Sequence, residues 1–370
     1  MTGEKVVHVR VPATSANLGP GFDALGLALS LYDDIEVRIT ENGLRIEIEG
    51  EGQDLANAGE EHLVVRALRA GFAAFAPPSA GQGPGAGAGA GQGPGAGAGA
   101  GQGPGAGTQP PGLALRCVNR IPHGRGLGSS AAAIVGGLLA AQTLTAEVGH
   151  GTAQAAAEAG HGTAQADLLA LATEMEGHPD NVAACLAGGL TIAWTTSRGP
   201  RLARLDPIPG IRPVVCIAPS DLAVRTELAR KALPGMVPHH EAAANAGRAA
   251  LLIAALTEKE AAAELFDATQ DWLHQAYRAQ AMPETYALVT ALRAHGVPAV
   301  VSGAGPSVLA FATAKPGLDT LDSIVRETGK AWRISSLDVA RQGARVLRPG
   351  VGEPSGTPLP RDTDDCEGMP

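Results

Sequence analysis

The segment that most constrains this chain is a glycine-spaced run that leads into an apolar stretch. Gly124, Gly126 and Gly128 alternate, a Ser-Ser pair follows at 129–130, and an alanine-rich run continues beyond it. Glycine adopts positive φ and lets backbone N–H groups converge on a ligand. At a helix N-terminus, such a turn presents unpaired donors and the positive end of the helix dipole to an anion. We therefore predict a phosphate-binding loop between a strand over 113–118 and a helix over 131–144.

The spacing of this loop differs from that of two common phosphate loops. A Walker A loop requires a lysine after its last glycine, and the dinucleotide fingerprint requires G-x-G-x-x-G. A plain glycine-rich turn between a strand and a helix is the alternative. The string P-x-x-x-G-L-G-S-S-A-A resembles the ATP-binding motif of the GHMP kinases. This resemblance implies ATP contacts at Pro122, His123, Gly124, Arg125, Gly126, Leu127, Gly128, Ser129, Ser130, Ala131 and Ala132.

A second motif lies near the start of the chain, where small and polar residues interrupt the apolar pattern between 11 and 29. We expect a loop there that carries Ser15, Asn17 and Asp23. An asparagine can donate and accept hydrogen bonds, and a carboxylate accepts from an ammonium or a hydroxyl group. An Asx-type turn that satisfies its own backbone is the alternative for Asn17. The segment P-x-T-S-A-N-L-G-P-G-F-D resembles the first motif of the homoserine kinases within the GHMP family. The resemblance implies that Asn17 and Asp23 bind the amino-acid substrate.

A third motif, E-G-H-P-D-N-V-A, follows a predicted helix over 167–175. The resemblance to homoserine kinases implies that a glutamate ligates Mg²⁺ together with Ser130 and that His178 contacts the substrate. Glu174 and Glu176 are turned by roughly 200° from each other on a helix, so one of them faces the ion, and we favour Glu176. A solvent-exposed helix face is the alternative for either glutamate.

The same motif ends in Asn181, which the resemblance places among the catalytic residues. In relatives of the mevalonate kinase type, an aspartate near this position is proposed as the catalytic base. An asparagine cannot take up a proton at neutral pH. The sequence therefore favours catalysis by alignment and charge stabilisation over catalysis by a strong general base.

Two arginine motifs follow in the second half of the chain. Thr226 precedes Arg230 by one helical turn, and His274 precedes Arg278 in the same way. Taken alone, both arginines are typical of solvated amphipathic helices. The segments resemble homoserine kinase motifs in which the arginines hold the substrate carboxylate, and this implies a catalytic role for Thr226 and Arg230 and substrate binding by Arg230 and Arg278. Ala276 stands where a proline is usual.

The last motif, V-S-G-A-G-P-S, is a glycine-rich turn between two predicted strands over 299–301 and 308–312. A plain hairpin connection is the alternative. The resemblance to the final GHMP motif implies that Gly303 and Gly305 contribute to ATP binding.

Mixed strands and helices predict an α+β chain in two parts. The resemblance implies a two-domain GHMP kinase fold, with a ribosomal-S5-like N-terminal domain over 1–200 and a ferredoxin-like C-terminal domain over 201–348. We expect the glycine-rich insert 81–107 and the tail 349–370 to be disordered, because they have little to bury. Further strands are expected over 6–11, 34–39, 44–48, 188–194 and 214–218, a proline-rich connection over 200–213, and further helices over 62–75, 227–233, 241–256, 261–275 and 318–326.

Composition excludes several other classes of protein. The net charge is −9 and only 3% of residues are aromatic, so neither a basic surface nor stacking platforms for nucleic acid are expected. We find no apolar run of about 18 residues that would span a membrane. The four cysteines are widely separated and fit free thiols in a reducing cytoplasm.

Together, these motifs imply ATP- and Mg²⁺-dependent phosphorylation of L-homoserine to O-phospho-L-homoserine, a step in threonine biosynthesis, by a chain that is compatible with a homodimer. Another GHMP kinase of the mevalonate or shikimate type is one alternative. A nucleotide-binding regulator of the same fold that does not turn over is another.

Overall fold

The computed structural model describes residues 5–75, 109–148, 161–222, 231–312 and 315–347. The strands are β1 (Val6–Ala16), β2 (Leu25–Thr40), β3 (Gly43–Gly50), β4 (Gly112–Asn119), β5 (Leu190–Thr196), β6 (Gly199–Leu205), β7 (Arg212–Ile217), β8 (Ala299–Val301), β9 (Val308–Ala312), β10 (Arg333–Ser336) and β11 (Arg345–Leu347). The helices are α1 (Leu63–Phe75), α2 (Ser129–Val148), α4 (His161–Glu176), α5 (Asp180–Ala187), α7 (His239–Thr257), α8 (Leu265–Ala268), α9 (Gln275–Arg278), α10 (Pro283–Ala294) and α11 (Lys315–Glu327). Short 3₁₀ turns η1 to η5 connect several of them.

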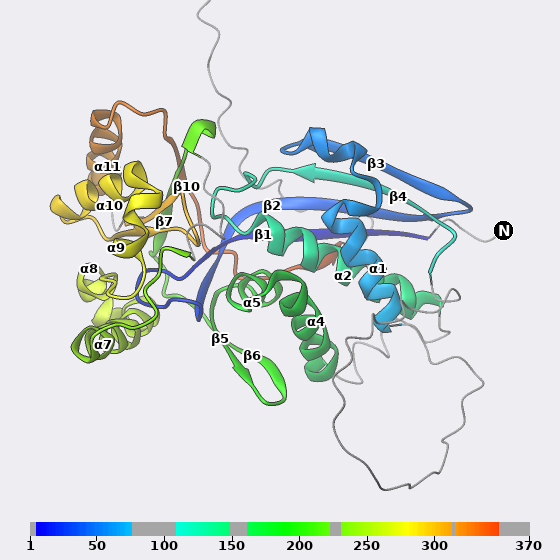
Figure 1. The fold of residues 1–370 in the computed structure, drawn as a ribbon, viewed down its shortest axis with the longest axis horizontal. Coiled ribbons are helices and arrows are strands. Elements are labelled where there is room, and N and C mark those ends of the chain that lie inside the picture. The colour runs from blue at the N-terminus through cyan, green and yellow to red at the C-terminus, as the bar shows by residue number, and fades with distance from the viewer. Residues whose placement is uncertain (1–4, 76–108, 149–160, 223–230, 313–314, 348–370) are drawn as a thin grey trace, which may run out of the picture.

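The strands form two sheets. The larger sheet has the order β11-β1-β2-β4-β3, and the hairpin β5–β6 joins it through β2. The smaller sheet has the order β10-β7-β9-β8. Helices α1, α2, α4 and α5 lie along the larger sheet, and α7 to α11 surround the smaller one (Figure 1). This arrangement of helices and sheets in two parts agrees with the predicted two-domain α+β fold.

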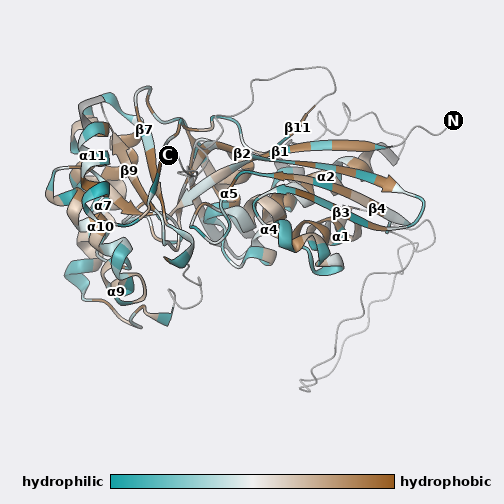
Figure 2. Ribbon diagram, turned by 90° about the horizontal axis from the view of Figure 1, so that it is seen from above, coloured by the Kyte–Doolittle hydropathy of each residue, from teal (hydrophilic) through white to brown (hydrophobic). Residues whose placement is uncertain are grey.

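Alternating side chains explain the layer formed by the larger sheet. Along the second half of β2, Leu31, Ile35 and Val37 are buried, whereas the residues between them are largely polar. Such alternation is expected when one face of a sheet packs on helices and the other meets water. Figure 2 shows the resulting mixture of hydrophobic and hydrophilic residues along β1, β2 and β4.

The strands β1 and β2 reach further than the sequence predicts. Most of the segment 11–29 was expected to be a loop, but β1 continues to Ala16, β2 begins at Leu25, and only the residues between them form the loop. Here the strands are buried on both faces, since every residue over 11–16 in β1 and over 25–29 in β2 is buried. Burial on both faces removes the alternation of apolar and polar residues by which a strand is recognised.

Two other expectations are wrong, and one helix around the smaller sheet was not predicted. The proline-rich connection contains β6, which among the described strands pairs with β5 alone, and an edge strand tolerates Pro200. The helix expected over 261–275 is divided into the 3₁₀ turn η4 (Lys259–Glu264), α8 and α9. The Asp271 carboxylate accepts N–H groups of three following residues and starts α9 anew. Helix α10 was not expected at all; it starts at Pro283, a residue that fits the first helical position.

Some expectations lie outside the described residues, namely the insert 81–107, the tail 349–370 and most of the helix over 227–233. The domain boundary at residue 200 stays a prediction. Strand β11, near the end of the chain, pairs with β1 in the larger sheet.

Helix α2 is the central helix of the larger half. Within the part of the chain that the structure describes, it is the one helix long and apolar enough to span a membrane by length and composition. The sequence had predicted no such run. In its apolar stretch Ser129–Ala146, 56% is buried, and the helix packs against α1, α4, α5 and β1. Its apolar character is therefore explained by packing inside the protein.

A buried carboxylate fixes the entry to the glycine loop. Asp33 on β2 accepts hydrogen bonds from the backbone N–H groups of Arg120 and Ile121, at 2.6 and 2.9 Å. Burial raises the pKa of Asp33 to about 7, although these two hydrogen bonds act in the opposite direction. The neighbouring Asp34 faces the other side of the sheet, where hydrogen bonds from Arg10 and Arg120 outweigh its burial and lower its pKa.

We predict that Asp33→Asn stabilises the protein at alkaline pH. The native state holds the proton on Asp33 between the usual pKa of 3.8 and about 7, so stability falls as pH rises through this window. The Asn amide oxygen keeps both hydrogen bonds without the buried charge. The Tm of the variant should exceed that of the wild type by about 2 °C or more at pH 8, and the difference should vanish near pH 4. Asp34→Asn is the control, and it should lower Tm at pH 8.

Candidate functional site

The three-glycine loop lies between β4 and the start of α2, as predicted. Gly126 and Gly128 both have a φ of 69°, in the left-handed region. A Cβ atom on Gly126 would lie 2.1 Å from the backbone oxygen of Ser302, and one on Gly128 would lie 1.9 Å from Thr14 Oγ1. Both positions therefore require glycine for conformation and for space. The backbone is free to approach a ligand closely at the N-terminus of a helix of 20 residues.

The turn 302–305 packs directly against this loop. The Ser302 hydroxyl donates to the Gly126 carbonyl at 2.7 Å and lies 2.8 Å from Ser15 Oγ. Because Ser302 has one hydroxyl hydrogen, the second bond requires donation from Ser15. Two predicted glycine-rich motifs, separated by more than 170 residues, thus meet in space.

Ser130 and Glu176 form the polar corner of the pocket. Ser130, in the first turn of α2, donates to Glu176 Oε1 at 2.6 Å, and Glu176 is the last residue of α4. Burial raises the pKa of Glu176, and the hydrogen bond from Ser130 partly offsets this effect. Glu174 is exposed and does not line the pocket. Of the two glutamates, Glu176 is the one near the serine hydroxyl; helical geometry predicted only that one of the two would face this point.

The H-P-D-N motif leads into the short helix α5, which the sequence did not predict. The Asp180 carboxylate is buried; it accepts from the Asn181 N–H and pairs with Nδ1 of His178. Asn181 Oδ1 accepts a hydrogen bond of 2.8 Å from the Thr14 hydroxyl. The Asn181 amide oxygen is therefore bound by Thr14 of β1, and its Nδ2 hydrogens are left to other groups, including those in the pocket. Thr14 was not singled out in the sequence, because its role depends on a contact across 167 residues.

The loop 17–24 has an unusual backbone. Asn17, Leu18 and Asp23 all have positive φ, at 68°, 50° and 53°. Asn17 holds this conformation: its Nδ2 donates to the Gly303 carbonyl at 2.7 Å, and its Oδ1 accepts from the Asp23 N–H at 2.9 Å. Neither bond is the Asx turn considered as the alternative for Asn17, because the acceptor bond spans six residues and the donor bond joins two distant loops. One Nδ2 hydrogen and one Oδ1 lone pair remain for other partners.

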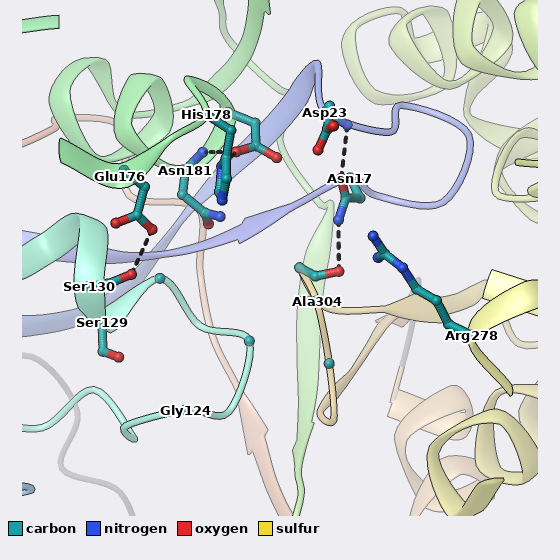
Figure 3. Close-up of a pocket in the computed structure, with 15 residues that line it drawn as sticks. Asn17, Asp23, Gly124, Ser129, Ser130, Glu176, His178, Asn181, Arg278 and Ala304 are labelled. Atoms are coloured by element: carbon teal, nitrogen blue, oxygen red, sulfur yellow. Dashed lines mark hydrogen bonds and ion pairs between the residues drawn. The ribbon is translucent and has the colours of Figure 1, made fainter. Parts of the chain in front are cut away.

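Arg278 approaches the pocket from the opposite side to Ser130 and Glu176 (Figure 3). It is the last residue of α9, is only 2% exposed, and its guanidinium carbon lies 5.1 Å from the centre of the Phe22 ring. Asn17 and Asp23 lie between Arg278 and the Glu176 corner in the same view. Cationic, anionic and amide groups therefore surround one small cavity.

Most of the predicted site residues converge here. The pocket lining includes Asn17, Asp23, Gly124, Gly126, Gly128, Ser129, Ser130, Glu176, His178, Asn181, Arg278, Gly303 and Gly305. Leu127, Ala131 and Ala132 are core residues instead, and Pro122 is buried beside them. Arg125 is half-buried outside the lining. Thr226 and Arg230 lie outside the described residues.

A second cavity shares Ser129 and Ser130 with the first one. Its wall includes Ile35, Leu55, His62 and the predicted ATP contact His123. His62 is 7% exposed, and its Nδ1 has no hydrogen-bond partner among the residues that the structure describes. Leu55 and His62 could not be singled out from the sequence, because neither belongs to a motif.

Two side chains of the pocket, Ser130 and Glu176, could bind a metal ion. Within the described ranges, no three His, Cys, Asp or Glu side chains gather as a metal cage. The hydroxyl of Ser130 and the carboxylate of Glu176 are oxygen donors of the kind that Mg²⁺ accepts. A cation held by these two groups would take its other ligands from water or from bound phosphate.

Comparisons with known proteins agree with this geometry. Residues 99–189 match the family model described as "GHMP kinases N terminal domain", and residues 248–332 match "GHMP kinases C terminal". A homoserine kinase of Streptomyces coelicolor is 49% identical over 92% of this chain and 94% of its own length. A homoserine kinase of Clavibacter michiganensis is 45% identical over 93% and 95%.

Solved structures share the fold at lower identity. Homoserine kinase from Cytophaga hutchinsonii superimposes with a TM-score of 0.69 at 22% identity, covering 94% of this chain and 99% of that one. Mevalonate kinase from L. major, solved with R-mevalonate, gives 0.56 at 14% identity, covering 93% and 97%. The overall arrangement of the two sheets and their helices is therefore shared by these enzymes.

We predict that Gly128→Ala weakens binding of an ATP analogue by at least about 100-fold, since moving the loop away from Thr14 costs two or more charge-assisted hydrogen bonds. Gly43→Ala is the control: Gly43 also has positive φ, but nothing lies within 4 Å of its Cβ position. The control should lose only the stability that left-handed strain costs, roughly 1–2 kcal/mol. Fluorescence titration and thermal unfolding of both variants separate the two effects. Tight binding by Gly128→Ala would contradict the role of this loop.

Proposed function

This chain belongs to the GHMP kinase family and groups there with the homoserine kinases, and from this premise we propose that it transfers the γ-phosphoryl group of ATP to the side-chain hydroxyl of L-homoserine. The product is O-phospho-L-homoserine, and the reaction belongs to amino-acid biosynthesis. The free, buried thiols of Cys117, Cys185 and Cys216 support a cytoplasmic enzyme.

One observation carries this proposal. A single pocket is lined by a phosphate-binding glycine loop with its Ser130–Glu176 corner and, on the other side, by an arginine, a carboxylate and an amide. The first set of residues suits a nucleoside triphosphate. The second set suits a small zwitterion, since a guanidinium pairs with a carboxylate and a carboxylate pairs with an ammonium group.

We infer that the nucleotide lies across both cavities. Backbone N–H groups around Gly126 and Gly128 would hold the phosphates at the start of α2. Ser129 and Ser130 line both cavities, so a bound molecule can pass from one to the other. The apolar walls at Ile35 and Leu55 suit the faces of a purine ring, and the unpaired His62 Nδ1 offers it a hydrogen-bonding group.

Ser130 and Glu176 are proposed to hold Mg²⁺. When bound, the ion neutralises charge on the transferred phosphoryl group. The two side-chain oxygens already lie 2.6 Å apart, so little rearrangement is needed for both to face one ion. The raised pKa of Glu176 fits a carboxylate that benefits from a nearby cation.

At the acceptor end, Arg278 is proposed to bind the homoserine carboxylate and Asp23 the ammonium group. Asn17 acts mainly by fixing the loop that carries Asp23, because both ends of its amide already hold backbone groups. His178 is proposed to contact the substrate, with its Nδ1 held by Asp180. The assignments of Thr226 to catalysis and of Arg230 to catalysis and substrate binding rest on the sequence motif alone.

Asn181 is proposed to align the acceptor hydroxyl and the phosphoryl group. An amide does not take up a proton at neutral pH, and the Thr14 hydroxyl occupies its oxygen. This arrangement supports transfer through a loose transition state, in which positioning and charge stabilisation provide most of the rate enhancement.

The substrate assignment is tested by ADP release. We expect turnover to require both Mg²⁺ and L-homoserine, and to be far slower with mevalonate, galactose, shikimate or D-homoserine. The D-enantiomer exchanges the positions of the groups that Arg278 and Asp23 bind, so it cannot satisfy both at once. Faster turnover of another alcohol would overturn the substrate while leaving the family intact. ATP binding without turnover of any acceptor would favour a regulator.

The metal assignment predicts matched losses of kcat. Ser130→Ala and Glu176→Gln should each lower kcat at least about 10-fold and raise the Mg²⁺ concentration needed for half-maximal rate. Glu174→Gln is the control, because Glu174 is exposed two residues away, and it should behave like the wild type. Unchanged kcat in the first two variants would contradict the metal site.

A further inference from the structure

We propose that His274 is a positioning residue for the acceptor site: as a neutral imidazole it orients the Arg278 guanidinium and ties it to the loop that carries Asp23. This inference rests on the proposed role of Arg278 in binding the substrate carboxylate. It assigns to His274 the task of presenting that arginine without neutralising it.

The chemistry of its two partners determines the tautomer of His274. Arg278 Nη1 lies 3.3 Å from His274 Nδ1, and the Gly19 carbonyl oxygen lies 2.9 Å from Nε2. A guanidinium can only donate and a carbonyl can only accept. Nδ1 must therefore carry the lone pair and Nε2 the hydrogen. A doubly protonated ring would lose the acceptor that faces Arg278.

The surroundings keep the ring in this state. His274 is 0% exposed, and burial lowers its pKa, with the nearby Arg278 acting in the same direction. The Asp271 carboxylate lies 3.7 Å from Nε2 and favours the charged ring, but it is already bound to the N–H groups of residues 273 to 275. Asp23 is the other anionic group nearby.

Phe22 completes the arrangement. Its ring stacks on the His274 ring at a centroid distance of 5.0 Å and an angle of 27°, and the Arg278 guanidinium lies over the same Phe22 ring. Phe22 is adjacent to Asp23 in the loop. Arg278 is therefore oriented by two groups. The Phe22 ring belongs to the loop 17–24, and the neutral His274 ring binds this loop through the Gly19 carbonyl.

A neutral acceptor has a specific advantage at this point. A carboxylate in place of His274 would also orient Arg278, but its negative charge would compete with the carboxylate of an incoming amino acid. A neutral imidazole fixes the direction of the Arg278 N–H groups and leaves the positive charge of the guanidinium available to the ligand carboxylate.

The experiment compares three substitutions at one position, with KM for L-homoserine, KM for ATP, kcat and Tm measured for each. Asn places its Oδ1 where His274 has Nδ1, and Asp has the same shape with a negative charge. We expect His274→Ala to raise KM for homoserine by about 10-fold or more, with KM for ATP within about twofold of the wild type. His274→Asn should recover most of this loss, and His274→Asp should not.

Asn245→Ala is the matched control. Asn245 on α7 is also buried and binds the same loop, since its Nδ2 donates to the Pro20 carbonyl at 2.8 Å; its amide binds this carbonyl and the Trp272 N–H rather than Arg278. It should lower Tm with a smaller rise in the homoserine KM than His274→Ala. An equal rise would assign the effect to the loop and overturn the inference.

The double variant His274→Ala/Arg278→Ala tests whether His274 acts through Arg278. We expect its homoserine KM to lie within about twofold of that of Arg278→Ala, whereas independent effects would multiply. Multiplying effects, a failure of Asn to recover affinity, or equal KM values for Asn and Asp would each overturn the role of His274. If Arg278→Ala alone leaves the homoserine KM unchanged, the proposed function of Arg278 fails, independently of these comparisons.

Discussion

The contact between Gly126 and Ser302 is the constraint on which the site depends. Two backbone segments from different sheets approach until no Cβ fits between them, and the Ser302 hydroxyl closes the contact. Around it, Asn17 holds the Gly303 carbonyl, and the Gly303 N–H donates to the Ala16 carbonyl. These contacts hold the phosphate-binding loop and the loop 17–24 at a fixed distance from each other. Neither half of the chain contains a complete pocket by itself.

Local features of the fold were predictable from the sequence, and features that depend on distant partners were not. The glycine loop and α2 are encoded within about 25 residues, so their order and position agree with the prediction. The ends of β1 and β2 were missed, because burial on both faces hides their periodicity. The division of the 261–275 helix depends on the carboxylate of Asp271, which competes for backbone N–H groups at a point that apolar spacing does not mark.

The candidate site divides in the same way. Motifs placed Asn17, Ser130, Glu176 and Arg278 among the functional residues, and all four line one pocket. Their partners could not be read from the sequence: Thr14 on the Asn181 amide and His274 between Arg278 and Gly19 depend on contacts across 167 and 255 residues. The wall at Leu55 and His62 has no motif either. Residue types indicate which chemistry is available, whereas long-range packing decides how each group is oriented.

Strand β11 has a consequence for how the protein is made. Its three residues pair with His8, Val9 and Arg10, so the outer edge of β1 is covered by a segment that follows more than 330 residues later. A ribosome synthesises the chain from the N-terminus, and β1 leaves it long before β11 exists. During that interval β1 presents unpaired backbone groups on one side. The larger sheet, although built mostly from the first half of the chain, is completed only after β11 has been synthesised and has paired with β1.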